Sequence, residues 1–139
     1  MSAHIRYGII GCGSMGREHI LNLRALDGVA VTAIADTHAP SREAALALCP
    51  TPPREFTDHA ELLQSGLCDA VVIATPNHTH VAMMRDALAT DLHILVEKPL
   101  VTRIGDGVEL VEQARGRRGL VWVAQEYRYM PPVAEMIRM

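Results

Sequence analysis

Short apolar runs alternate along the chain with longer stretches in which apolar residues recur every three or four positions. The short runs predict strands and the longer pattern predicts helices. The expected strands cover residues 5–10, 29–36, a short segment at Phe56, 69–75, 91–97 and 120–126. The expected helices cover residues 14–27, 41–48 with Ser41 as its cap, 58–65 capped by Asp58, 79–90 and 106–116.

This alternation predicts the α/β class, with a doubly wound parallel sheet covered by helices on both faces. The nearly continuous apolar runs of strands 29–36 and 69–75 fit burial on both sides of such a sheet. The tail at 131–139 begins with two prolines, and one side of its expected helix carries Val133, Met136 and Ile137. That apolar side finds no partner in the sequence, so we expect the tail to lead toward a second domain.

A glycine-rich turn follows the first strand directly and opens the first helix; it reads Gly11-Cys12-Gly13-Ser14-Met15-Gly16. In such a turn Gly11 permits the tight bend, Gly13 lets the backbone approach a pyrophosphate, and Gly16 allows close packing of helix on strand. The free N–H groups and the dipole of the helix start favour bound phosphate. Placed between a strand and a helix, the motif predicts an NAD(P)-binding Rossmann domain whose cofactor contacts these six residues.

Asp36 ends the second expected strand, twenty residues beyond Gly16, where an acidic residue would meet the adenosine ribose. A carboxylate there accepts hydrogen bonds from the ribose hydroxyls and repels a 2′-phosphate. The sequence therefore favours NAD, with NADP as the alternative if Arg42 or His38 receives a phosphate. An ordinary turn residue after a strand is the other interpretation of Asp36.

Three further strand ends carry polar side chains at the edge where ligands of a doubly wound sheet bind. Thr75, Pro76, Asn77 and His80 follow the strand at 69–75, where Asn77 or Thr79 would cap the next helix. Cofactor contacts and a capped turn with solvated histidines are both open for Asn77 and His80.

The next strand ends at Glu97-Lys98-Pro99, and the last is followed by Gln125. An ammonium group at Lys98 can hydrogen-bond a substrate oxygen and assist proton transfer, with Glu97 as its salt-bridge partner or a cofactor contact. Read alone, Glu-Lys-Pro is more often a surface turn. Polar and aromatic groups from Gln125 onward could line a nicotinamide pocket or form a packing cluster at a domain junction.

Together these motifs resemble the Gfo/Idh/MocA oxidoreductases, the family of glucose–fructose oxidoreductase and inositol dehydrogenase. The matching segments cover about residues 5–130 in the family's order: GIIGCGSMGREHI, AIAD, DAVVIATPNHTHVAMMRDAL, ILVEKPL and VAQEYRY. The resemblance implies that Lys98 is the catalytic lysine, which contacts the reacting oxygen, and that the Lys98–Pro99 bond is cis. It also implies that the cofactor is contacted by Thr75, Pro76, Asn77, His80, Glu97, Lys98 and Gln125.

The activity that the resemblance implies is hydride transfer between a nicotinamide cofactor and a sugar, cyclitol or related polyol. Family members continue into a second domain that supplies a histidine for proton transfer, and no position here matches it. We therefore expect a dinucleotide-binding domain at 1–126, the start of a linker helix at 127–139, and slow or no turnover by this chain alone. A non-catalytic nicotinamide-sensing or partner-binding module is the alternative, and a member acting on non-sugar carbonyls or dihydrodiols is a weaker one.

Composition narrows the classes of partner. The net charge of −3, without a long Lys/Arg run, gives no reason to expect a nucleic-acid partner. The cysteines Cys12, Cys49 and Cys68 are widely spaced, which argues against a metal site and fits a reducing cytoplasm. No run approaches the roughly 20 apolar residues that cross a bilayer, so no membrane association is expected. The apolar tail predicts association, and we expect a homo-oligomer that binds a small-molecule substrate.

Overall fold

The computed structural model describes residues 4–139, so the first three residues of the expected 1–126 domain lie outside the described part. Its centre is a six-stranded sheet in which every strand pair is parallel. The strands are β1 (Ile5–Ile10), β2 (Val29–Ala35), β3 (Arg54–Phe56), β4 (Ala70–Ile73), β5 (His93–Glu97) and β6 (Val121–Ala124). Their order across the sheet is β3-β2-β1-β4-β5-β6, the strand order of a Rossmann fold.

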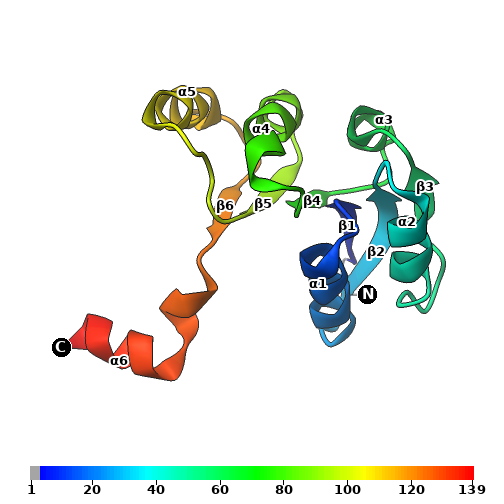
Figure 1. Ribbon diagram of the computed structural model, residues 1–139, viewed down its shortest axis with the longest axis horizontal. Helices are drawn as coiled ribbons and strands as arrows, with labels where there is room; N and C mark the ends of the chain where they lie inside the picture. The colour runs from blue at the N-terminus through cyan, green and yellow to red at the C-terminus, as the bar shows by residue number, and fades with distance from the viewer. Residues whose placement is uncertain (1–3) are drawn as a thin grey trace.

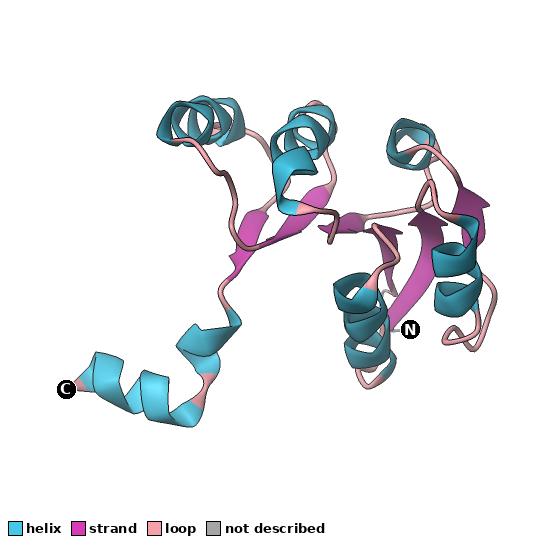
Figure 2. Cartoon of the chain, in the orientation of Figure 1, coloured by secondary structure: helices cyan, strands magenta, loops and turns pink. Residues whose placement is uncertain are grey.

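Helices cover both faces of the sheet, and α1 and α2 lie on the side opposite to α3, α4 and α5 (Figures 1 and 2). The α-helices are α1 (Ser14–Arg24), α2 (Ala39–Leu46), α3 (His59–Gln64), α4 (His80–Leu88), α5 (Ile104–Ala114) and α6 (Pro131–Arg138). Two short 3-10 turns, η1 (Asn77–Thr79) and η2 (Glu126–Tyr129), precede α4 and α6. The expected doubly wound parallel α/β fold is thus confirmed.

The continuous apolar runs of the strands fill two cores, because successive side chains of a strand point to opposite faces. Ile9, Ile34 and Val72 join Ile20 of α1 and Ala45 of α2 in one buried cluster. Their immediate neighbours enter the other cluster, beneath α3, α4 and α5, and include Ile10, Ala33, Ala35, Val71 and Ile73. The two-sided burial explains why these strands lack polar alternation.

Several element ends differ from the sequence-based expectation. Helix α2 begins at Ala39 rather than Ser41, with His38 at the N-cap, since Pro40 fits the first turn of a helix. Asp58 does cap α3 as predicted, because its carboxylate accepts a 2.9 Å hydrogen bond from the N–H of Ala60. Thr79, one of the two predicted caps, is the N-cap residue of α4, but its side chain makes no capping hydrogen bond.

Arg117 joins the loops at the amino ends of β5 and β6, on the sheet edge opposite to the expected site. Its guanidinium donates to the carbonyl oxygens of Thr90, Leu92 and Gly119. Burial lowers the pKa of this guanidinium. One side chain therefore holds together the two loops that lead into the neighbouring strands β5 and β6.

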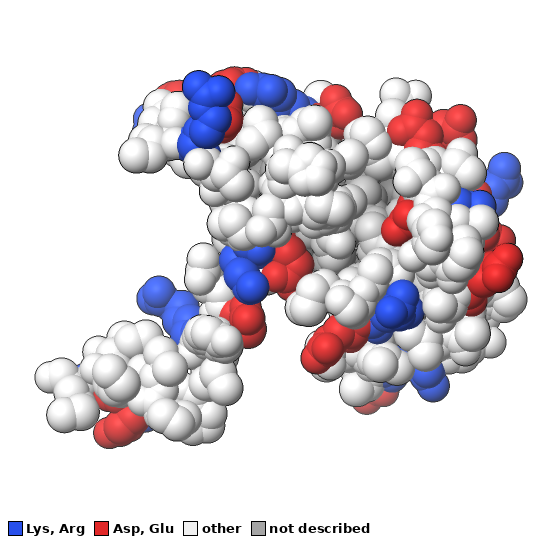
Figure 3. Space-filling model, in the orientation of Figure 1, with Lys and Arg blue, Asp and Glu red and all other residues white. Residues whose placement is uncertain are grey.

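The C-terminal helix α6 projects from the sheet on the η2 segment and stands apart from the other helices (Figure 1). Its apolar residues Met136 and Ile137 are 72% and 59% exposed, and Trp122 of edge strand β6 is 56% exposed. Within residues 4–139, no helix has the length and apolar character needed to cross a membrane. Acidic and basic side chains are interspersed on the face drawn in Figure 3.

Candidate cofactor cleft

A cleft of about 760 Å³ opens at the carboxyl ends of β1, β2 and β4. This is the point where the order of the sheet reverses direction, because β2 and β4 lie on opposite sides of β1. Seven of the predicted cofactor residues line it: Gly11, Gly13, Ser14, Met15, Asp36, Thr75 and Pro76. The predicted residues Cys12, Gly16, Asn77, His80, Glu97, Lys98 and Gln125 lie outside its lining.

The three glycines of the turn occupy their positions for different structural reasons. Gly11 has a φ of +95°, and a Cβ there would lie 2.6 Å from the carbonyl oxygen of Ala74. A Cβ on Gly16 would overlap the carbonyl oxygen of Gly11. A Cβ on Gly13 would meet no protein atom within 4 Å. The space beside Gly13 belongs to the cleft, and this residue is the N-cap of α1.

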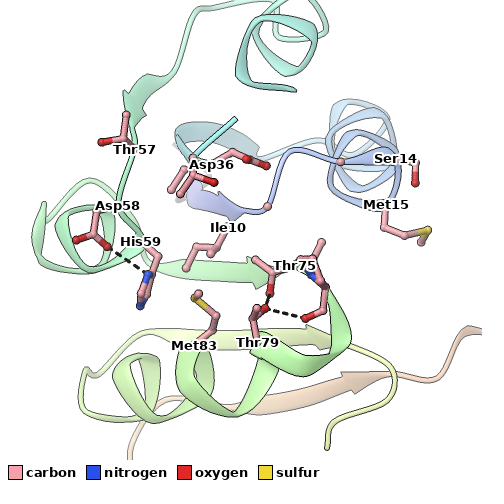
Figure 4. Close-up of a pocket in the computed structure, with 16 residues that line it drawn as sticks. Ile10, Ser14, Met15, Asp36, Thr57, Asp58, His59, Thr75, Thr79 and Met83 are labelled. Carbon is pink, nitrogen blue, oxygen red and sulfur yellow. Dashed lines mark hydrogen bonds and ion pairs between the residues drawn. The ribbon is translucent and has the colours of Figure 1, made fainter. Parts of the chain in front are cut away.

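The start of α1 suits an anion. The N–H groups of its first turn have no partner within the helix, and that turn contains no acidic residue. Ser14 and Met15 flank this end of the cleft in Figure 4. The room at Gly13 and the free donors together fit a pyrophosphate without a cationic side chain.

Asp36 follows β2 and lies between the glycine turn and the loop that leads from β2 to α2. Its Oδ2 accepts a 2.7 Å hydrogen bond from the N–H of Cys12, and its Oδ1 accepts one of 2.8 Å from the N–H of His38. A carboxylate offers about four acceptor positions, so about two remain for ribose hydroxyls. The fixed orientation of Asp36 therefore fits the adenosine ribose of a dinucleotide.

The two residues considered as receivers of a 2′-phosphate have partners already. Arg42 donates 2.7 Å from Nη1 to the carbonyl oxygen of Asp36 and 3.2 Å from Nε to Glu55. Its side chain is only 15% exposed. The Nδ1 of His38 lies 2.9 Å from the hydroxyl oxygen of Ser41.

The far end of the cleft contains residues that sequence reasoning missed. Thr57, Asp58 and His59 come from the end of β3 and the start of α3, and Met83 comes from α4 (Figure 4). His59 lies 3.2 Å from Asp58 and 2.6 Å from Asp86. Their one signal in the sequence is their position directly after the short strand at Phe56.

The segment after β4 enters the cleft with Thr75, Pro76 and Thr79. The hydroxyl oxygen of Thr79 lies 2.7 Å from both the hydroxyl of Thr75 and the carbonyl oxygen of Pro76, and it makes no capping hydrogen bond to α4. Asn77 is exposed beside the cleft. His80 is fully buried, with its ring between backbone carbonyls, which excludes the alternative of a solvated histidine at this position.

At the end of β5, Glu97 is buried and Lys98 is exposed. The Oε1 of Glu97 lies 2.8 Å from Nε2 of His19 on α1, and its Oε2 accepts a 3.2 Å bond from the N–H of Lys98. Of the two alternatives for Glu97, a salt bridge with Lys98 is not formed among the described residues. The Lys98–Pro99 peptide bond is cis, as the resemblance implies. Gln125 is exposed after β6.

Cys12 lies inside the glycine turn but points into the protein. It is fully buried, and its thiol lies 3.8 Å from the carbonyl oxygen of Ala35. Burial, helped by the charge of Asp36, raises the pKa of this thiol to about 12. Its contribution to the cleft is therefore its backbone N–H, which is engaged by Asp36.

Comparisons with known proteins agree with this geometry. Residues 5–125 match the Gfo/Idh/MocA family, described as "Oxidoreductase family, NAD-binding Rossmann fold". Inositol 2-dehydrogenase 2 of Paenarthrobacter aurescens is 40% identical over 108 residues, which are 77% of this chain and 32% of that protein. The chain thus spans about a third of the length of this relative.

Solved structures of similar fold include complexes with the cofactor. The myo-inositol dehydrogenase of Lactobacillus casei, in complex with NAD(H) and myo-inositol, matches with a TM-score of 0.90 and 30% identity over 97% of this chain and 40% of that one. The WlbA dehydrogenase of Bordetella pertussis, in complex with NADH and UDP-GlcNAcA, matches with a TM-score of 0.85 and 28% identity over 93% and 37%.

The family match covers most of the chain, and the Lys98–Pro99 bond is cis, as the resemblance implied. The chain therefore belongs to the Gfo/Idh/MocA oxidoreductase family and carries its NAD-binding Rossmann fold.

Proposed function

We propose that this chain is the nucleotide-binding portion of an NAD-dependent dehydrogenase that acts on a CH–OH group of a sugar, cyclitol or related polyol. The observation that carries the proposal is the meeting of Asp36 with the glycine turn at one cleft. That arrangement supplies a pyrophosphate site and a ribose acceptor side by side.

NAD is the preferred cofactor in this proposal, and NADP is disfavoured. A 2′-phosphate would lie against the carboxylate of Asp36, whose two oxygens are fixed by backbone donors. Arg42 could neutralise it only by leaving the carbonyl oxygen of Asp36 and the carboxylate of Glu55. These costs add to the like-charge repulsion.

The roles of individual residues follow from their places. The first-turn N–H groups of α1 hold the pyrophosphate, and Asp36 orients the adenosine ribose. The bound nicotinamide supplies the hydride chemistry. Lys98, at the carboxyl end of β5, donates a hydrogen bond from its ammonium group to the reacting substrate oxygen and polarises it. Asn77, Glu97 and Gln125 are the proposed cofactor contacts at this end of the sheet, whereas the buried His80 lies outside the cleft lining.

The substrate class rests on the relatives. Several matched proteins are inositol 2-dehydrogenases, at 32–40% identity. We propose a cyclitol as the first candidate, ahead of open polyols, non-sugar carbonyls and dihydrodiols.

We further propose that residues 1–126 form the dinucleotide-binding domain and that residues 127–139 begin a linker. We also propose that the protein is a cytoplasmic homo-oligomer.

A binding titration and an activity assay test the proposal. NADH is titrated into the purified chain by calorimetry, and NAD reduction at 340 nm is followed with stoichiometric chain and a panel of inositols, sugars and dihydrodiols. We expect saturable NADH binding and slow oxidation of at least one cyclitol, which Lys98→Met abolishes. Absence of NADH binding would overturn the cofactor assignment. Because no turnover by this chain alone is also expected, it is oxidation that discriminates: oxidation that Lys98→Met abolishes would exclude the nicotinamide-sensing module, which has no need of Lys98.

A further inference from the structure

Lys98 is the only lysine of the 139-residue chain. Its side chain is exposed, and among residues 4–139 its ammonium forms no ion pair or hydrogen bond. A long side chain without a partner has no preferred position of its own. The place of Lys98 must therefore be set by the backbone on either side of it, at Glu97 and at Pro99.

His80 lies on the Pro99 side of the lysine. It is the first residue of α4 and is 0% exposed. Its Nδ1 lies 2.7 Å from the carbonyl oxygen of Pro99, and its Nε2 lies 2.9 Å from that of Thr75. A neutral ring donates to one of the two oxygens and an imidazolium to both. With a proton on Nδ1 the ring donates to Pro99 and joins the start of α4, which follows the cleft loop, to the loop that carries Lys98; an imidazolium also donates to Thr75.

His19 acts on the Glu97 side. It lies on α1, the helix that begins at the glycine turn, and its Nε2 lies 2.8 Å from Oε1 of Glu97. The Glu97 side chain is 9% exposed, and its other oxygen accepts the N–H of Lys98. A buried carboxylate is stable only with such partners. The backbone just before Lys98 is thus tied to the helix that would hold the pyrophosphate.

We infer that His80 is a positioning residue: it fixes the Lys98 loop to the cofactor cleft, with the His19–Glu97 pair as the second anchor. His80 is absent from the cleft lining, so it acts through the backbone of Thr75 and Pro99. The importance of this fixing for catalysis rests on the role proposed for Lys98. The attachment of the Lys98 loop to the cleft does not depend on that role, and it can be measured without turnover.

The single lysine provides the probe. Reductive methylation with ¹³C-formaldehyde retains the charge of the amine and labels only Lys98 and the N-terminus. The Lys98 signal is then followed by ¹H–¹³C NMR, and amide hydrogen exchange is measured on the peptide covering residues 95–101. The variants are His80→Leu, which removes both ring nitrogens, His80→Gln, which retains N–H donors, and His19→Leu. His78→Leu is the matched control, because His78 is exposed in the same turn.

For His80→Leu we expect a shifted Lys98 signal and an exchange rate at 95–101 raised about tenfold, while the peptides of β1 and β2 exchange as before. His80→Gln should restore most of both signals, and His78→Leu should change neither. If His80→Leu does not fold, His80→Gln and His19→Leu decide: the inference then requires faster exchange at 95–101 in His19→Leu than in His80→Gln.

Wild-type signals in folded His80→Leu, or equal loss in His78→Leu, overturn the inference. Failure of the proposed function looks different: NADH and myo-inositol leave the Lys98 signal of the wild-type chain unmoved, while the His80 variants still change it. The two ideas are therefore judged by separate observations.

Discussion

The carboxylate of Asp36 accepts a 2.7 Å hydrogen bond from the backbone N–H of Cys12, across 24 positions of the chain. This bond ties the end of β2 to the glycine turn after β1, so the proposed ribose acceptor and the proposed phosphate site move as one unit. A hydrogen bond from a backbone N–H to a charged acceptor is among the stronger kinds in proteins. The cleft is thus organised by the protein's own contacts.

Asp36→Asn should weaken the discrimination against NADPH. The amide retains one acceptor oxygen for the N–H of Cys12 but loses the negative charge that repels a 2′-phosphate. We expect the ratio of NADPH to NADH dissociation constants to fall about tenfold, which is ~1.4 kcal/mol. Calorimetric titration of both cofactors measures it. Asp27→Asn, at an exposed position, is the control; an equal change in both variants would refute the assignment of Asp36.

Gly13→Ala and Gly16→Ala should separate binding from folding. The new Cβ at position 13 meets no protein atom, so stability should change by less than about 1 kcal/mol while NADH affinity falls about tenfold. The new Cβ at position 16 overlaps the carbonyl oxygen of Gly11, so the melting temperature should fall by about 5 °C or more. Thermal melts with and without NADH check both, and a Gly13→Ala protein that binds NADH normally would contradict the site.

The thiol of Cys12 should make the chain less stable at high pH. Its pKa is raised to about 12 in the folded state from 9.0, so the folded chain retains a proton that the unfolded chain releases. The stability is fully present below about pH 9 and is lost as the pH rises toward 12. Urea unfolding at pH 8 and pH 10.5 measures the loss, and Cys12→Ala should reduce it. The same thiol should resist alkylation in the folded chain at pH 8.

The apolar side of α6 should drive self-association. Met136 and Ile137 are both more than half exposed, and exposed apolar groups of this size usually find partners. Replacing both by Glu should lower the association constant measured by sedimentation equilibrium at least about tenfold. Glu135→Gln, on the same helix, serves as the control. An unchanged distribution in the double variant would show that this surface is not the contact.

The strands and the glycine turn could be predicted because their signals are local. The apolar runs at Ile9–Ile10 and Val71–Val72 fill both faces of the sheet, and a turn such as Gly11 to Gly16 is specified by neighbours in sequence. Helix ends were less predictable, since the start of α2 depends on the tolerance of its first turn for Pro40.

Residues brought together by the fold gave no such signal. Met83 faces the cleft from the middle of α4, where its spacing indicates only a helix face. The pairing of His19 with Glu97 spans 78 positions, and nothing near either residue marks the other. The sequence did single out His80, but only the fold shows that its ring contacts two carbonyls and lies outside the cleft lining.

The Arg117 contacts at the opposite edge of the sheet have a consequence for how the protein can change. The cleft and Lys98 occupy the carboxyl ends of the strands, whereas Arg117 holds the amino ends of β5 and β6. Substitutions that strengthen or weaken that distant edge should alter how long the chain survives heating while its preference among cofactors stays the same. Durability and chemical selectivity are therefore separable traits in this fold, open to independent adjustment by natural variation or by design.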